Sequence, residues 1–162
     1  MSPSPRPSLR DPAVLLATWF GAGMMPKAPG TWGSAAALPF AWIIVSLGGP
    51  TALGVASIAV YFLGVWAADR TIAVTGIKDP GLVVIDEVVG QWIVLMFSPL
   101  NPLFYLTGFA LFRLFDIFKP WPVSWADQKI GGGTGVMLDD VLAGVYGLAL
   151  QELILLAWHG AL

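Results

Sequence analysis

Long apolar segments alternate along the chain with short polar or glycine-rich connections. Five segments are apolar enough to predict membrane-embedded helices, and they cover residues 33–47, 52–68, 82–97, 103–118 and 141–158. Several are shorter than the ~20 residues that a full crossing needs, so tilted or partly inserted helices are expected. A shorter apolar stretch, Ala13 to Phe20, follows Asp11 and Pro12, which favour the start of a helix. The pattern therefore predicts an all-α, multihelical polytopic membrane protein with four to five membrane helices and a short N-terminal interfacial helix.

Composition favours a membrane protein over a soluble one. The 162 residues are 57% hydrophobic and 11% charged, whereas a soluble domain is about 25% charged. Eight tryptophans are typical of the aromatic belts at membrane surfaces. Residues 1–10 are rich in proline and lack a long apolar run, which predicts a disordered arm rather than a signal peptide. Residues 11–162 are then expected to form a single membrane-embedded domain.

Charged residues are distributed unequally between the connections. Residues 48–50, 98–102 and 160–162 carry no charge. The N-terminal arm with its following loop, residues 69–81 and residues 119–135 carry seven of the eight Lys and Arg residues. Five crossings would place all these basic connections on one side of the membrane, and the positive-inside rule makes that side cytoplasmic. No basic run indicates a nucleic-acid partner, and no feature indicates a protein partner.

Two adjacent acidic pairs, Asp86-Glu87 and Asp139-Asp140, stand at the predicted cytoplasmic ends of apolar segments. A carboxylate at membrane depth costs at least ~2.5 kcal/mol, and neighbouring carboxylates repel one another. A divalent cation would compensate this charge, and ligands that are all oxygens favour Mg²⁺ or Mn²⁺. The lack of Cys and the remote position of the single His159 argue against zinc. Capping of helix N-termini is the alternative interpretation, because acidic residues are favoured there.

Small residues follow both acidic pairs at helical spacing. Gly90 lies four residues after Asp86, and Gly144 and Gly147 lie four and seven residues after Asp140. Such faces allow membrane helices to approach closely, which would bring the two acidic pairs together. Helix packing without any attached site is the simpler interpretation, and it is compatible with the first.

Basic residues accompany the acids at the end of the fourth apolar segment. Arg113, Asp116 and Lys119 follow one another at intervals of three and fall near one helical face, and Pro120 then ends the helix. One interpretation assigns the two cations to phosphate oxygens, with Asp116 as a metal ligand or as the group that orients them. The other is a ladder of ion pairs whose Lys and Arg side chains extend toward the membrane surface.

Two glycine-rich stretches are expected to form loops on the same side of the membrane. Residues 21–34 contain Lys27, Gly30 and Thr31 directly before a predicted helix, where backbone N–H groups attract anions. This stretch is not a Walker A loop, and an ordinary re-entrant turn is the alternative. The second stretch, residues 131–135, precedes an acidic pair and is expected to be a lid or a linker.

The same residues restrict how a phosphate ester could be hydrolysed. The chain has no Cys for a phosphocysteine, its His159 lies on the uncharged side, and the Asp-x-Asp signature of haloacid dehalogenase-type enzymes is absent. The remaining routes are attack by metal-activated water or direct attack by a lone carboxylate such as Asp86 or Asp139. We favour the water.

Three blocks of spaced residues carry a more specific signal, and together they cover most of residues 21–147 in order. The blocks are Gly21-x-Gly-x-x-Pro-x-x-Pro-Gly-Thr-x-Gly-Ser34, Asp79-x-Gly-x-x-x-x-Asp86-Glu87-x-x-Gly90-x-Trp92, and Phe112-Arg113-x-x-Asp116-x-x-Lys119-Pro120-Trp-Pro122 continued through Asp127, Gly132-Gly133-x-Gly135-x-Met137-x-Asp139-Asp140 and Ala143-Gly144. With these blocks the chain resembles the phosphatidylglycerophosphatase A family of bacterial membrane enzymes. Ile85 departs from the family pattern, in which Trp is common before the Asp-Glu pair.

The resemblance implies a reaction and a place in the cell. The reaction is the Mg²⁺-dependent hydrolysis of phosphatidylglycerophosphate to phosphatidylglycerol and inorganic phosphate, a step of phospholipid biosynthesis. The place is the bacterial inner membrane, in which a multi-pass protein surrounded by membrane lipids would direct its active site toward the cytoplasm.

The acidic clusters and the resemblance together give the candidate site residues. The expected metal ligands are Asp79, Asp86, Glu87, Asp139 and Asp140. The expected catalytic residues are Asp86, Glu87, Asp116, Asp139 and Asp140, and the expected phosphate-binding residues are Lys27, Gly30, Thr31, Arg113 and Lys119. The alternatives are a non-catalytic scaffold and a small divalent-cation transporter or channel, for which the outer half of the membrane offers only Gln91 and Glu152 as polar groups.

Overall fold

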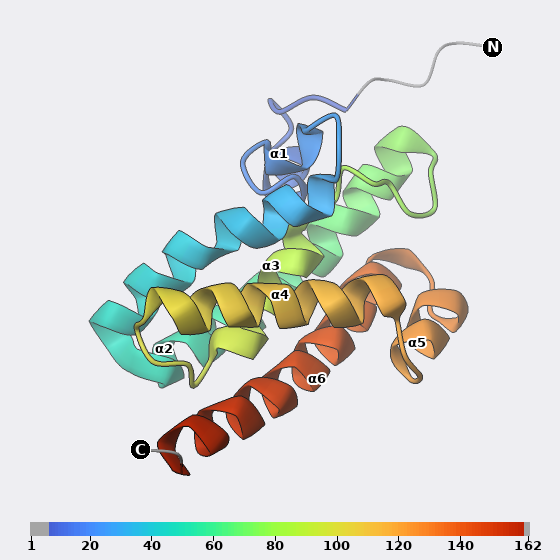
Figure 1. The fold of residues 1–162 in the computed structure, drawn as a ribbon. Helices are drawn as coiled ribbons and strands as arrows, with labels where there is room; N and C mark the ends of the chain where they lie inside the picture. The colour runs from blue at the N-terminus through green and yellow to red at the C-terminus, as the bar shows by residue number, and fades with distance from the viewer. Residues whose placement is uncertain (1–6, 161–162) are drawn as a thin grey trace, which may run out of the picture.

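Every regular element in residues 7–160, the part of the chain that the computed structural model describes, is a helix (Figure 1). This confirms the all-α prediction for these residues. The first six residues of the expected N-terminal arm lie outside the described part. The elements are α1 (Pro12–Ala17), the 3₁₀ helix η1 (Ala22–Met24), α2 (Pro29–Thr75), α3 (Ile85–Leu95), α4 (Pro102–Phe118), α5 (Val123–Lys129) and α6 (Gly132–Gly160).

The first helix begins where the sequence predicts it. The side chain of Asp11 accepts a hydrogen bond from the backbone N–H of Ala13 at 2.9 Å, and Pro12 occupies the first helical position. α1 ends at Ala17, so it is only about one and a half turns long. It packs against α2. It is therefore too short to cross a membrane, as expected.

The long helix α2 is broken in its middle at Gly49. The backbone there has φ 68° and ψ −171°, a conformation that glycine adopts without steric cost, and Pro50 follows directly. The chain reverses at this point, so the two halves of α2 form a hairpin (Figure 1). The predicted segments 33–47 and 52–68 lie on either side of the break, one in each half.

Two helices, α2 and α6, are long and apolar enough to cross a membrane. This is fewer than the four to five membrane helices predicted from the sequence. Helix length explains the difference, because the 11 residues of α3 rise about 16 Å and the 17 residues of α4 about 26 Å. The hydrocarbon core of a bilayer is ~30 Å thick. α2 also counts once, although Gly49 divides it into two helical halves.

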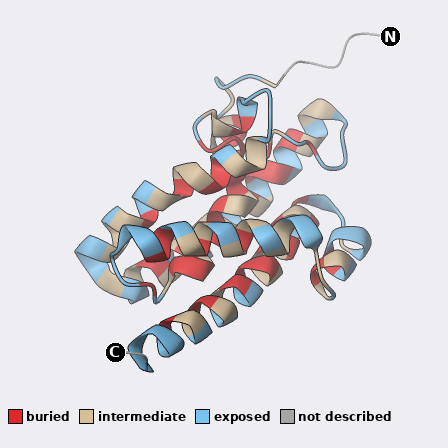
Figure 2. Ribbon diagram, viewed as in Figure 1, coloured by how far each residue is buried: buried red, intermediate tan, exposed pale blue. Residues whose placement is uncertain are grey.

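The short helix α3 lies at the centre and is the most buried element. Val88, Val89 and Leu95 are almost fully buried between α2, α4 and α6. The indole N–H of Trp92 donates a hydrogen bond to the backbone oxygen of Ala37 at 3.0 Å, which joins α3 to the first half of α2. Figure 2 shows that the buried positions follow the sides of the helices that face one another, while the outer sides are exposed. Apart from Gln91, the residues of α3 after its first turn are apolar or glycine, which matches this central place.

Helix α6 begins nine residues before the predicted apolar segment, at Gly132. The prediction that residues 131–135 form a lid or a linker is wrong, because residues 132–135 build the first turn of this helix. The carboxylate of Asp69, on α2, accepts a hydrogen bond from the backbone N–H of Gly133 at 2.6 Å. A side chain 64 residues away in sequence therefore supplies the N-terminal cap.

Glycines bring α3 and α6 into backbone contact. A Cβ atom placed on Gly144 would lie 2.6 Å from the backbone oxygen of Gly90, and one placed on Gly90 would lie 2.7 Å from the backbone oxygen of Asp140. Neither position has room for a larger residue. The close approach predicted from the small residues after each acidic pair is confirmed.

The two ends of the helix bundle differ in composition. One end, which we name the uncharged end, contains the Gly49 break, the connection of residues 96–101 and the end of α6 (Figure 1). The opposite end, which we name the charged end, contains α1, α5 and the connections of residues 76–84 and 119–122. Those basic residues predicted to share one side of the membrane that belong to residues 7–160 therefore share one end of the structure.

Candidate functional site

Three carboxylates from two helices meet at the charged end. Asp86 and Glu87 lie in the first turn of α3, and Asp140 lies in the third turn of α6. Each offers one oxygen atom, and these oxygens all lie within 4.8 Å of one another. The glycine contact between α3 and α6 lies one turn deeper and holds the two acidic segments at this separation.

The acidic pairs do not act as helix caps. α3 is preceded by Val84 and has no side-chain cap, although Asp86 and Glu87 lie in its first turn. The other pair, Asp139-Asp140, lies well inside α6, which begins at Gly132. The capping interpretation is therefore wrong for Asp139-Asp140, whereas Asp86-Glu87 lies in the first turn, where acidic residues are favoured, without capping the helix by a side-chain hydrogen bond.

Several of these oxygens lack any hydrogen-bond partner. Asp86 Oδ1 and Glu87 Oε2 are inaccessible to solvent, and no donor in the described residues reaches them. Buried polar atoms in proteins almost always have a partner, and unpaired buried carboxylates are costly. A compact set of oxygen-only ligands with unused lone pairs fits a hard divalent cation such as Mg²⁺.

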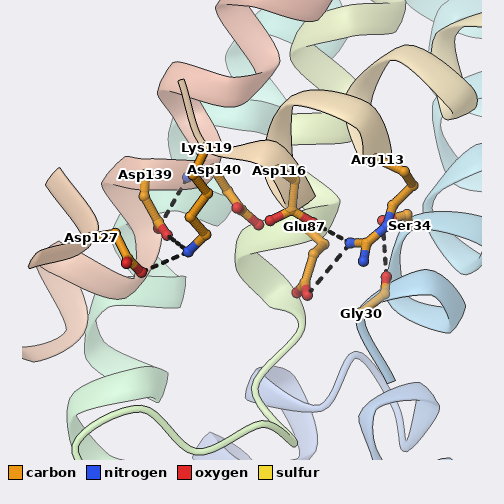
Figure 3. Close-up of polar contacts among 9 residues, drawn as sticks. All are labelled: Gly30, Ser34, Glu87, Arg113, Asp116, Lys119, Asp127, Asp139 and Asp140. Atoms are coloured by element: carbon orange, nitrogen blue, oxygen red, sulfur yellow. Dashed lines mark hydrogen bonds and ion pairs between the residues drawn. The ribbon is translucent and has the colours of Figure 1, made fainter. Parts of the chain in front are cut away.

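Arg113 is the cation nearest to this cluster. Its guanidinium forms an ion pair with Asp116, one turn further along α4, and lies 3.9 Å from Glu87 Oε1 (Figure 3). The helix N-terminus of α2 closes this side, since a Cβ atom on Gly30 would collide with Glu87 Oε1 and lie 3.1 Å from the Arg113 guanidinium. The glycine at position 30 therefore makes room for the Glu87–Arg113 contact.

Lys119 is the second cation, and it joins three elements. Its Nζ atom donates hydrogen bonds to Asp127 of α5 at 2.6 Å and to Asp139 of α6 at 2.7 Å (Figure 3). Lys119 ends α4 in a left-handed conformation, with φ 43°, and its side chain leaves the helix face that carries Asp116. The predicted ion-pair ladder thus forms only in its first step, from Arg113 to Asp116.

The carboxylates of Asp127 and Asp139 stabilise the protonated form of Lys119. Burial disfavours the ammonium ion, but the hydrogen bonds to Asp127 and Asp139 outweigh burial and raise the pKa of Lys119 above its ordinary value. The side chain consequently stays positive throughout the neutral pH range.

A pocket of about 330 Å³ opens above these residues at the charged end. Its lining contains seven carboxylates and three cations. They are Asp79, Asp86, Glu87, Asp116, Asp127, Asp139 and Asp140, with Lys78, Arg113 and Lys119. Because negative charge is in excess, a phosphate anion would be repelled from the pocket unless an additional cation were bound.

Most of the residues predicted for the site line this pocket, but two do not. Lys27 is exposed in the loop before α2 and does not belong to the lining. Thr31 is also outside the lining, and its backbone N–H donates to the oxygen of Ala28 at 3.0 Å within the first turn of α2. The structure therefore does not bring Lys27 and Thr31 together with the other predicted phosphate-binding residues.

Two charged lining residues, Lys78 and Asp127, were absent from the predicted site. Asp127 belongs to the third sequence block, but only the fold shows that it shares Lys119 with Asp139. Lys78 immediately precedes Asp79, and this adjacency to a predicted ligand is the sequence signal that could have identified it.

The polar residues of the other half of the bundle lie apart from the pocket. Neither Gln91 nor Glu152 belongs to its lining. Gln91 is fully buried in α3, and both atoms of its side-chain amide lack hydrogen-bond partners in the described residues. The polar surface of the pocket therefore does not extend to the two residues that a transport pathway would need.

Comparison with known proteins places these residues in a family. The family model of phosphatidylglycerophosphatase A matches residues 15–155. The chain belongs to the phosphatidylglycerophosphatase A family. The family match includes all of the carboxylates and cations that line the pocket.

Individual relatives agree with the family match. A phosphatidylglycerophosphatase A of Haemophilus influenzae is 42% identical over 146 residues, which is 90% of both chains. One of Escherichia coli is 40% identical over 141 residues, 86% of this chain and 81% of its own. A Bacteroides thetaiotaomicron protein with the provisional name phosphatidylinositol-3-phosphatase is 46% identical over 145 residues, 85% of this chain and 89% of its own. No solved structure matches the chain.

Proposed function

We propose that this protein removes the terminal phosphate of phosphatidylglycerophosphate and releases phosphatidylglycerol. The observation that carries the proposal is that one pocket of a chain from this family contains two cations and three clustered carboxylates, of which Asp140 is buried and Asp86 and Glu87 are half-buried. The names of the Haemophilus influenzae and Escherichia coli relatives support the glycerol phosphate headgroup. The name of the third relative makes an inositol phosphate headgroup the competitor to test.

Mg²⁺ is the proposed cofactor, held by Asp86, Glu87 and Asp140. The unpartnered oxygens of Asp86 and Glu87 support this assignment, because a cation would supply the partner that the protein does not. When bound, the ion would neutralise phosphate charge and lower the pKa of a coordinated water. Asp79 and Asp139 line the same pocket and are proposed to complete the ligand set, directly or through water.

Arg113 and Lys119 are proposed to hold the phosphate oxygens. Both cations line the pocket, and each already contacts two carboxylates of the site. These contacts fix the positions of the cations before substrate arrives, which limits the reorganisation that binding requires. Asp116 orients the Arg113 guanidinium, so that its remaining N–H groups can donate to phosphate.

The membrane arrangement is part of the same proposal. α2 and α6 would cross the bacterial inner membrane, and the halves of α2 would form a helical hairpin that turns at Gly49. The charged end would face the cytoplasm, because the basic residues gather there. The substrate would keep its acyl chains in the bilayer, and its headgroup would reach the pocket from the side.

Phosphate release from a panel of lipid phosphates tests the proposal. The panel contains phosphatidylglycerophosphate, phosphatidic acid and phosphatidylinositol 3-phosphate in detergent micelles, with EDTA or with added Mg²⁺. We expect release from phosphatidylglycerophosphate to stop in EDTA and to return with Mg²⁺. Preferred release from the inositol lipid would overturn the proposed substrate, and flux of Mg²⁺ across liposomes without lipid hydrolysis would favour a transporter.

The ligand assignment is tested with Asp86→Asn, and Asp11→Asn is the matched control at an N-cap outside the pocket. Asp86→Asn should lower kcat/KM by at least about a hundredfold, which exceeds the usual effect of losing an outer-shell partner of a metal. It should not lower the unfolding temperature in EDTA, because it removes a charge from a repulsive cluster. Near-normal activity in both Asp86→Asn and Asp140→Asn would contradict the assignment.

A further inference from the structure

An apolar groove runs along the bundle beside the charged pocket. Its volume is about 540 Å³, and it is formed by the second half of α2, by α3 and by α6. Apolar atoms form its exposed walls, and several of its residues, such as Ile58 and Phe62, are more than half exposed. No charged residue belongs to its lining, so the groove suits a hydrocarbon occupant and excludes a polar one.

The groove begins at the carboxylate cluster. On α3 its wall consists of Val89, Ile93 and Met96, and Asp86 precedes them by three residues on the same helical face. On α6 its lining includes Leu138 and Val141, which directly flank the Asp139-Asp140 pair. A molecule that occupies the groove therefore has one of its ends, the one toward the charged end of the bundle, beside Asp86.

The length of the groove fits one leaflet of a membrane. The lining residues of α2 run from Gly54 to Phe62, a rise of about 12 Å, and those of α3 run from Val89 to Met96, about 10 Å. Half of the hydrocarbon core is about 15 Å. The groove thus extends over most of the depth that one acyl chain occupies, starting at the level of the acidic residues.

We propose that this groove seats one acyl chain of the lipid phosphate and thereby places the headgroup at the carboxylate cluster. The inference rests on the proposed function and adds the feature that separates lipid substrates from soluble ones. A water-soluble glycerol phosphate has no chain to fill the groove, so it gains none of the binding that positions its phosphate. Specificity for a lipid arises on α2 and α3, outside the charged pocket.

Photolabelling of the wild-type protein tests the groove directly. The probe is phosphatidylglycerophosphate with a photoactivatable group near the end of one acyl chain, and labelled peptides are identified by mass spectrometry. Labels should concentrate at Met96 and at the lining residues Gly54, Ser57 and Ile58, and unlabelled phosphatidylglycerophosphate should compete with them. Labels spread evenly over outward-facing residues such as Leu47 and Leu106, without competition, would overturn the inference by showing only bulk lipid.

A variant that fills the far end of the groove gives an independent test. A Cβ atom on Gly54 would lie 3.8 Å from Met96 Cε, an ordinary contact, so Gly54→Leu extends into the groove without displacing the backbone. The next residue, Val55, is 63% exposed and lies outside the lining, which makes Val55→Leu the matched control. Leucine favours helix in both positions.

The readout is the ratio of kcat/KM for long-chain over short-chain phosphatidylglycerophosphate. Gly54→Leu should lower this ratio about tenfold, the effect of displacing about two methylene groups from apolar contact, and Val55→Leu should leave it unchanged. An unchanged ratio in a folded Gly54→Leu protein would contradict the groove. If the wild type hydrolysed neither substrate, the proposed function would fail, while competition in the photolabelling would still decide the groove.

Discussion

The charged and uncharged ends of this bundle contain different kinds of buried polar group. At the uncharged end, the side-chain amide of Gln151 donates to Ser98 Oγ at 3.2 Å and to the backbone oxygen of Phe104 at 2.9 Å, which joins α6 to the connection before α4 and to the first turn of α4. Its own Oε1 atom has no partner in the described residues. At the charged end, like charges are crowded, and buried oxygens of Asp86 and Glu87 have no partner. The polar groups of the uncharged end hold helices together, whereas those of the charged end are available to bind a ligand.

The difference shows where the free energy that holds the site together comes from. The carboxylates at the charged end repel one another, so packing elsewhere in the bundle and the ion pairs of Arg113 and Lys119 must hold them close. The glycine contact between α3 and α6 lies one turn below the acids and supplies close packing. We name the ion pairs of Lys119 with Asp127 and Asp139 the Lys119 clasp. Substitutions at the glycine contact, at the clasp and at the uncharged end should therefore differ in their effects on activity and stability.

The largest effect is expected from Gly144→Leu, because its side chain would push against the backbone of Gly90. Overpacking of this kind costs about 1–3 kcal/mol of stability. Displacement of the catalytic groups by about 1 Å lowers activity about a hundredfold, so hydrolysis should fall by at least that factor. Gly160→Leu is the control, since a Cβ atom there meets nothing within 4 Å. Wild-type hydrolysis by Gly144→Leu would show that the crossing does not set the site.

An intermediate effect is expected from Lys119→Met, which removes the link between α4, α5 and α6. Asp127 and Asp139 would then lose their shared cation. We expect kcat/KM to fall by at least about tenfold, and stability to fall as well. Lys129→Met changes an exposed lysine of α5 without an ion pair in the described residues, and it should have neither effect.

The pH dependence of the Lys119→Met stability loss tests the clasp further. Because the folded-state pKa of Lys119 is raised, its stabilisation is fully present below the unfolded pKa of about 10.4 and is lost only as the pH rises through the folded value. The difference in unfolding free energy between wild type and variant should therefore stay constant from neutral pH to about pH 9. A difference that vanished within this range would contradict the clasp.

The smallest effect on activity is expected from Gln151→Leu at the uncharged end. It removes two buried hydrogen bonds that join α6 to Ser98 and Phe104, which should lower the unfolding free energy by about 1–3 kcal/mol. Phosphate release per folded molecule should not change, because the pocket lies at the other end. A loss of activity similar to that of Lys119→Met would show that the two ends are coupled.

The apolar pattern predicted α1, the two halves of α2, α3, α4 and most of α6, but not η1 or α5, and the spacing of small residues predicted the contact between α3 and α6. Segments 33–47 and 52–68 fall on the two halves of α2, and Gly90 meets Gly144 as expected. The start of α6 was not predictable in the same way. A run of glycines normally indicates a loop, and the cap that makes it helical comes from Asp69, far away in sequence.

The site was predictable as a set of charges but not as a set of pairs. Spacing placed Arg113, Asp116 and Lys119 on one helical face, and only the first two interact. Lys119 instead turns toward Asp127 and Asp139, because the chain leaves the helix at that residue in a left-handed conformation. Local periodicity describes contacts within a helix, whereas a contact across three elements depends on how the helix ends.

The backbone contact at Gly90 and Gly144 also limits how this site can diversify. Glycine is the smallest residue, so any substitution at the crossing can only push α3 and α6 apart. The separation of the two acidic pairs therefore already stands at its minimum, and mutation at the crossing can change it in one direction only. A change of headgroup selectivity would instead have to come from the surrounding wall, at exposed lining positions such as Lys78, where a side chain can be exchanged without moving the helices.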